Sequence, residues 1–115
     1  MKRTPSSAQC SKLLKAVADP ERLRIIELLR DGAARPVTEI ATELRLPMQN
    51  ASHHLKLLRT AGIVTAAKAG RFVRYALAAK YASKPTAPGR SLDVLDFGCC
   101  RLELGDRPAA SRDDR

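Results

Sequence analysis

The stretch from Glu39 to Leu77 constrains the fold most, because its apolar pattern changes period partway along. Over Met48–Thr60 one stripe recurs at helical spacing, and its members are Ala51, His54, Leu55 and Leu58. A shorter helix over residues 38–44 precedes it, and Pro47 suits the first turn of the longer helix. After Ile63 the period falls to two, and Lys68-Ala69-Gly70-Arg71 is typical of a hairpin turn. The stretch therefore predicts two helices joined by a short turn, followed by a β-hairpin.

The polar side of the Met48–Thr60 helix carries amide, hydroxyl, imidazole and ammonium groups but no carboxylate. Such groups match the donors and acceptors of base edges and phosphates in a DNA major groove. An ordinary solvated helix face would explain the same pattern. The candidate DNA contacts are Gln49, Asn50, Ser52, His53 and Lys56 on the helix, and Lys68, Arg71 and Arg74 on the hairpin.

The charge distribution favours the DNA interpretation. No Asp or Glu occurs between Glu43 and Asp93, while nine Lys and Arg lie there, and the whole chain carries a net charge of +9. A field of one sign indicates a polyanionic partner, and nucleic acid is the first candidate. A membrane surface is the alternative, but the helix lacks a wide apolar face with Trp or Phe to insert.

Three separated motifs resemble the ArsR/SmtB family of repressors over residues 8–80. They are Ala18-Asp19-Pro20-x-Arg22-Leu23-Arg24-Ile25, then Ser52-His53-His54-Leu55-Lys56-x-Leu58-x-x-Ala61-Gly62-Ile63-Val64, and finally Gly70-Arg71-x-x-x-Tyr75. The resemblance implies a mainly α winged helix-turn-helix with a β-hairpin wing. It also implies a cytoplasmic homodimer that binds double-stranded operator DNA and releases it when an effector binds. DNA binding itself would require no cofactor.

The rest of the chain is organised around this unit. Residues 1–82 are expected to form the winged helix, 83–90 a linker, 91–104 an extended cysteine-containing segment and 105–115 a disordered tail. A first helix over 7–18 places Cys10, Leu13, Leu14 and Val17 on one face, and Asp19 caps a second helix ending near Arg30. Many family members end in a long dimerisation helix. Residues 91–104 are better explained as one strand than as such a helix. Because the C-terminal dimerisation helix is then absent, the first helix is the expected dimer contact.

No signal peptide and no apolar run of about 20 residues is present, so we expect a cytosolic protein without a membrane partner. The three cysteines should then be reduced thiols. Cys10, Cys99 and Cys100 match the three-thiolate shell of arsenite or antimonite, and less well zinc or cadmium, which want a fourth ligand. The family's usual metal positions are empty here, since the third helix lacks Cys and no His follows the hairpin.

Geometry limits this metal hypothesis. Adjacent side chains of a regular strand point to opposite faces, so Cys99 and Cys100 need a bend, which Gly98 permits. Cys10 is equally well explained as a small core residue. His54 is expected to be a buried core histidine, and His53 an outward DNA contact.

Two other function classes remain open. One is a redox-responsive DNA-binding regulator with a reversible disulfide between Cys10 and Cys99 or Cys100. The other is a small enzyme or interaction module, although the sequence contains no catalytic triad, paired carboxylates or Gly-rich phosphate loop, so an enzyme is not expected. Release of DNA by an oxidant would favour the first class, and salt-independent association the second.

Overall fold

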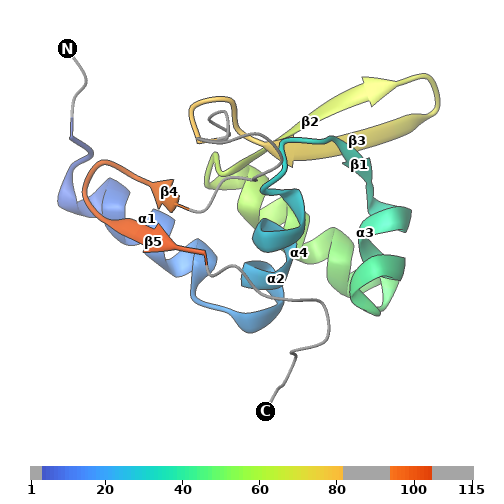
Figure 1. Cartoon of the computed structure of the whole chain (residues 1–115), viewed down its shortest axis with the longest axis horizontal. Helices are drawn as coiled ribbons and strands as arrows, with labels where there is room; N and C mark the ends of the chain where they lie inside the picture. The colour runs from blue at the N-terminus through green and yellow to red at the C-terminus, as the bar shows by residue number, and fades with distance from the viewer. Residues whose placement is uncertain (1–3, 82–93, 105–115) are drawn as a thin grey trace.

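A computed structural model describes residues 4–81 and 94–104. Four helices come before a β-hairpin that extends away from the helical body, and a second small hairpin lies beside the first helix (Figure 1). The helices are α1 Ser7–Val17, α2 Pro20–Leu29, α3 Val37–Leu44 and α4 Met48–Thr60. The strands are β1 Arg35–Pro36, β2 Val64–Ala69, β3 Phe72–Leu77, β4 Val94–Asp96 and β5 Arg101–Glu103. The winged helix-turn-helix predicted from the sequence is confirmed.

Local signals explain where the helices begin. Ser6 and Gln9 form a reciprocal capping box at the start of α1. The Asp19 carboxylate accepts the first backbone N–H groups of α2, and Pro20 occupies the first helical position. Pro47 proves to be the residue before α4 and not, as predicted, a member of its first turn. Its extended ψ of 143° explains the difference, because that backbone has not yet entered the helix.

The helix-turn-helix consists of α3 and α4, joined across residues 45–47. Arg45 ends α3 in the left-handed region with φ of 56°, and its backbone N–H returns to carbonyls of α3. This tight end lets the chain reverse within three residues. The turn therefore holds α4 across α3 with its inner stripe facing the core.

One hydrophobic core holds the helices and both hairpins together. Helix α2 contributes three fully buried side chains, Ile25, Ile26 and Leu29, and therefore lies at the centre of this core. The same core includes Leu55 and Leu58 of α4, so the helix is fixed by apolar burial worth about 1.5–3 kcal/mol per side chain. No helix in the described ranges combines enough length and apolar character to cross a membrane.

The wing is the β2–β3 hairpin, which pairs from Val64↔Leu77 out to Ala69↔Phe72. Its turn is Gly70-Arg71, the last two of the four predicted residues, and Gly70 supplies the positive φ of 64° that the turn requires. The short strand β1 adds to β3 and completes the order β1-β3-β2. Pro36 is tolerated in β1 because β1 is an edge strand.

The C-terminal segment is extended, but it forms two strands and not the single strand expected. Strands β4 and β5 pair antiparallel, and the backbone N–H of Phe97 donates to the Cys100 carbonyl across the turn between them. Phe97 packs edge-to-face on Tyr81, with ring centroids 5.4 Å apart, and Leu95 is fully buried. The segment therefore packs into the core of the winged helix. The predicted linker 83–90 and tail 105–115 lie outside the described residues.

Candidate functional site

Helix α4 has two chemically distinct faces, as predicted. Ala51, His54, Leu55 and Leu58 are buried. The outer face of α4, meaning Gln49, Asn50, Ser52, His53 and Lys56, is exposed in all five positions. A rigid helix with its apolar side fixed in the core thus presents amide, hydroxyl, imidazole and ammonium groups to solvent.

The wing continues the same kind of surface. Lys68, Arg71 and Arg74 are exposed, and no ion pair within the described part of the chain involves them. By contrast, Arg35 is held by Asp31 at 2.7 Å and by Glu39 at 3.4 Å. The wing bases are therefore free of acidic partners from the described chain and suit a phosphate backbone. All eight predicted DNA contacts lie on accessible surface.

A polar network beneath α4 connects it to α2 and α1. The Arg22 guanidinium donates through Nη1 to His54 Nδ1 at 3.1 Å and through Nε to the Ala16 carbonyl at 2.6 Å. Because Arg only donates, His54 Nδ1 must accept, so Nε2–H donates to Glu21 Oε1 at 2.8 Å. His54 is buried, as predicted from its place on the inner stripe.

Asp19 lies at the edge of this network. Backbone N–H donation from Arg22, together with the charge of the Arg22 guanidinium, lowers the pKa of the Asp19 carboxyl below 3.8. The donor atoms of Asp19, Glu21 and His54 lie within 4.8 Å of one another, a spacing compatible with a cation. Their oxygens and ring nitrogens are, however, engaged in helix capping and in the hydrogen bonds just described. The group is therefore explained as a structural network.

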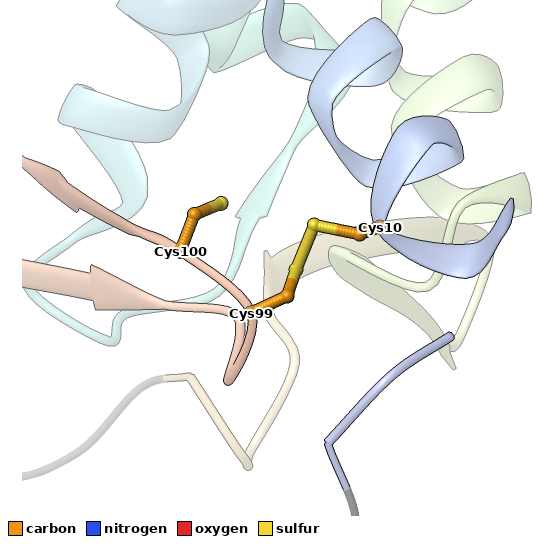
Figure 2. Close-up of side chains that lie close together, drawn as sticks. All are labelled: Cys10, Cys99 and Cys100. Atoms are coloured by element: carbon orange, nitrogen blue, oxygen red, sulfur yellow. A yellow bond between two sulfur atoms is a disulfide. The ribbon is translucent and has the colours of Figure 1, made fainter. Parts of the chain in front are cut away.

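The three cysteines form the other cluster, although Cys10 and Cys99 are 89 residues apart (Figure 2). Cys10 projects from α1, while Cys99 and Cys100 lie in the turn between β4 and β5. All three sulfurs lie within 4.8 Å of one another. The predicted convergence of the thiols is confirmed, and Cys10 is half-buried and not a core residue.

The turn before Cys99 explains how neighbouring cysteines reach one place. Gly98 has φ of +90°, a conformation that side chains disfavour, and a Cβ there would lie 3.0 Å from Pro5 Cδ. Its N–H donates to the Asp96 carboxylate at 2.8 Å. The bend predicted at Gly98 is therefore present, and it brings both thiols to the side of α1.

The oxidation state differs from the prediction. Cys10 and Cys99 are joined by a disulfide, and only Cys100 is a free thiol. The sequence predicted three reduced thiols from an expected cytosolic location. Spatial proximity, which composition does not reveal, makes the pair competent to oxidise.

The expected dimer contact on α1 is corrected in part. Leu13 and Val17 are buried within the protomer, so they are not available to a second copy. Leu14 is exposed, and with Cys10, Ser11 and Lys15 it lines a shallow hollow on the outer side of α1. Helical periodicity placed all four apolar residues on one broad face, but tertiary packing divides that face.

Comparisons with known proteins agree with this architecture. A family model described as a helix-turn-helix domain matches residues 17–66. The transcriptional regulator CmtR of Mycobacterium tuberculosis is 47% identical over 68 residues, which are 59% of this chain and 57% of CmtR. An uncharacterised transcriptional regulator of Methanocaldococcus jannaschii, MJ1325, is 40% identical over 67 residues, covering 58% of this chain and 75% of that protein.

A solved structure also resembles this fold. The homodimeric winged helix-turn-helix DNA-binding domain of Mb0332 from Mycobacterium bovis, described as a possible ArsR-family regulator, superposes with a TM-score of 0.61 at 32% identity. The match covers 65% of this chain and 68% of that one. The chain thus spans little more than half the length of CmtR but most of the other two relatives.

Proposed function

Because the chain belongs to the ArsR/SmtB family of winged-helix transcriptional regulators, we propose that it is a homodimeric repressor whose hold on operator DNA is controlled by Cys10, Cys99 and Cys100. The observation that carries the proposal is the convergence of three sulfurs within 4.8 Å from two distant segments of the chain. Helix α1, which bears Cys10, also contacts α4, so the cluster is one helix away from the outer face of α4.

DNA docking follows from the exposed groups. With the outer face of α4 in the major groove, Gln49, Asn50, Ser52 and His53 are directed at base edges, and Lys56 at a phosphate. The wing bases Lys68, Arg71 and Arg74 then contact the flanking backbone. Two copies related by a twofold axis would read half-sites about one helical turn apart. Sedimentation at micromolar concentration should therefore show a dimer, and tight binding of a palindrome by a monomer would contradict this part.

The docking surface has a direct test. Lys56→Ala and Arg71→Ala should each weaken binding and reduce the salt slope by about one unit, because each removes one phosphate contact. Arg101→Ala is the matched control, since Arg101 is an exposed base on β5, away from the wing (Figure 1). Unchanged slopes for the first two variants would show that DNA docks elsewhere or not at all.

For the sensor, we propose As(III) or Sb(III) as the inducer. In the reduced protein, three Cys thiols and arsenous acid form a trigonal As(SR)₃ centre and release three waters, so no electron transfer occurs. A pyramidal three-coordinate ion fits a cluster in which the described residues offer three sulfur ligands. Zinc and cadmium fit less well, because they prefer four ligands. Induction requires the ion to bind the DNA-free state more tightly, with a coupling of about 1–3 kcal/mol.

A second function is favoured by one observation, the Cys10–Cys99 disulfide. An oxidant such as diamide would take two electrons and two protons from the two thiols and form the same α1-to-turn link without an ion. The experiment that separates the two functions starts from the reduced protein–DNA complex. Release by arsenite in the absence of oxidant supports metalloid sensing, release only by diamide supports redox sensing, and release by neither contradicts both.

A further inference from the structure

The wing tip carries an aromatic side chain that the DNA-docking surface described above does not use. Phe72 is 60% exposed, more than any other large hydrophobic side chain among the described residues. It is the first residue of β3, directly after the Gly70-Arg71 turn, and it pairs with Ala69. A single exposed apolar residue is common on protein surfaces. The residues next to Phe72 are what indicate a function for it.

The cross-strand neighbours on the side of the hairpin that carries Phe72 are small. Alternation along β3 places Phe72 and Arg74 on one face, and their cross-strand partners are Ala69 and Ala67. The opposite face continues into the core through Tyr75 and the buried Leu77. Phe72 therefore remains 60% exposed beside these small residues. The hairpin does not need this ring for its own core.

The charged groups at the wing tip are all cationic. Lys68, Arg71 and Arg74 are exposed along the same tip, and the sequence places no acid anywhere between Glu43 and Asp93. A contact between the wing tips of two copies would bring like charges together, which repel. An exposed aromatic residue at a cationic tip instead complements a polyanion that has an apolar interior between its charges. Duplex DNA has this property, with stacked bases lying between two phosphate backbones.

We propose that Phe72 is an apolar wedge, which enters the DNA minor groove beside the major-groove site of α4, partly unstacks one base step and bends the duplex. The inference rests on the proposed DNA-binding function and adds a specificity determinant to it. Arg71 and Arg74 flank the ring and contact the phosphates on the two sides of the minor groove. Partial unstacking costs the least at pyrimidine–purine steps, so the wedge selects for a TA or CA step without hydrogen-bonding it.

The experiment uses the full chain and duplexes that the wild-type protein selects from a random library. Phe72→Ala should weaken binding about tenfold, the usual scale for loss of one aromatic–base contact. Its salt slope should remain that of the wild type, because the ring is uncharged, whereas Arg71→Ala lowers the slope. Val73→Ala is the matched control, since Val73 is the next residue on the opposite face of β3. It tests whether simple damage to the hairpin explains the loss.

Two readouts report the wedge itself. With 2-aminopurine placed at successive positions of the duplex, wild-type protein should raise fluorescence at one step flanking the α4 site, and Phe72→Ala should not. Energy transfer between dyes on the duplex ends should show a bend for the wild type, Val73→Ala and Phe72→Trp, and a straighter duplex for Phe72→Ala. The library selected with Phe72→Ala should lose the preference for TA or CA at that step.

Each contrary outcome has its own meaning. Equal bending and fluorescence for wild type and Phe72→Ala would overturn the wedge while leaving DNA binding intact. A change in sedimentation of Phe72→Ala in the absence of DNA would assign the ring to a protein contact and overturn it as well. If the wild-type protein selects no duplex, the proposed function fails first, and the wedge fails with it.

Discussion

At the scale of single residues, Asp19 combines a helix cap with a charge that folding favours. Hydrogen bonds from the Arg22 and Glu21 backbone N–H groups stabilise its ionised form, so its folded pKa lies below 3.8. A depressed folded pKa stabilises the protein fully above the unfolded value, and this contribution disappears as pH falls through the folded pKa. Asp19→Asn keeps a competent cap but removes the charge. Denaturant unfolding should show the variant less stable at neutral pH, with the difference shrinking below pH 3.8.

The companion variant separates capping from charge. Asp19→Ala should cost about 1 kcal/mol at neutral pH through loss of the cap alone, in addition to the loss of charge. If Asp19→Asn were as unstable relative to the wild type at low pH as at neutral pH, the ionised carboxylate would not be the stabilising species.

At the scale of elements, two adjacent histidines of α4 are expected to behave in opposite ways. His54 joins α4 to α2 through Arg22 and Glu21, whereas His53 is exposed. His54→Ala should lower the free energy of unfolding by about 2–4 kcal/mol, because it opens a cavity and leaves two polar partners unsatisfied. His53→Ala should leave stability within about 0.5 kcal/mol of the wild type. Its effect should instead appear in DNA sequence preference, at about 1–3 kcal/mol per lost contact.

Thermal or urea unfolding of the two variants, followed by DNA binding at a temperature where both are folded, checks this contrast. A His54→Ala protein as stable as His53→Ala would mean that the buried network does not fix α4. A His53→Ala protein with unchanged sequence preference would remove His53 from the docking surface.

The same scale shows how much of the fold the sequence predicted. Helix α2, with its Asp19 cap, and helix α4, with its apolar stripe, were predicted almost to the residue, because local signals and burial agree there. Strand β1 was missed, since two residues carry no periodicity and the strand exists only through pairing with β3. The β4–β5 hairpin was predicted to be one strand because its periodicity is near two and Gly98 in its middle disfavours a helix. Gly98 instead adopts a positive φ and turns the chain back on itself.

The candidate site also contains parts that the sequence predicts and parts that it does not. The outer face of α4 and the wing bases follow from spacing and charge, so they were predictable. The partners of His54 were not, because Arg22 and Glu21 are 32 and 33 residues away and nothing local links them. Sequence indicated that three thiols meet, but the disulfide depends on how α1 and the Gly98 turn are placed in the folded chain.

At the scale of the whole molecule, the Cys10–Cys99 link closes a loop of 89 residues that contains most of the fold. Constraining so long a loop in the unfolded chain should stabilise the oxidised protein by about 2–4 kcal/mol relative to the reduced one. Cys10→Ser should be as stable as reduced wild type and insensitive to reductant. Cys100→Ser should keep the full redox dependence, because Cys100 is outside the disulfide. Urea unfolding with and without dithiothreitol measures all three, and equal stability of oxidised and reduced wild type would contradict the link's structural role.

Arsenite titration of a DNA complex shows whether the thiol cluster controls DNA release. Fluorescence anisotropy would follow a labelled operator duplex bound to fully reduced wild-type protein and to the Cys99→Ser/Cys100→Ser variant. Both proteins should bind the duplex with equal affinity, because the cluster lies on α1 and the β4–β5 turn rather than on the outer face of α4. Arsenite should then release the duplex from the wild type only. Release of the duplex from the double variant at the same arsenite concentration would contradict the account and place the sensing site elsewhere.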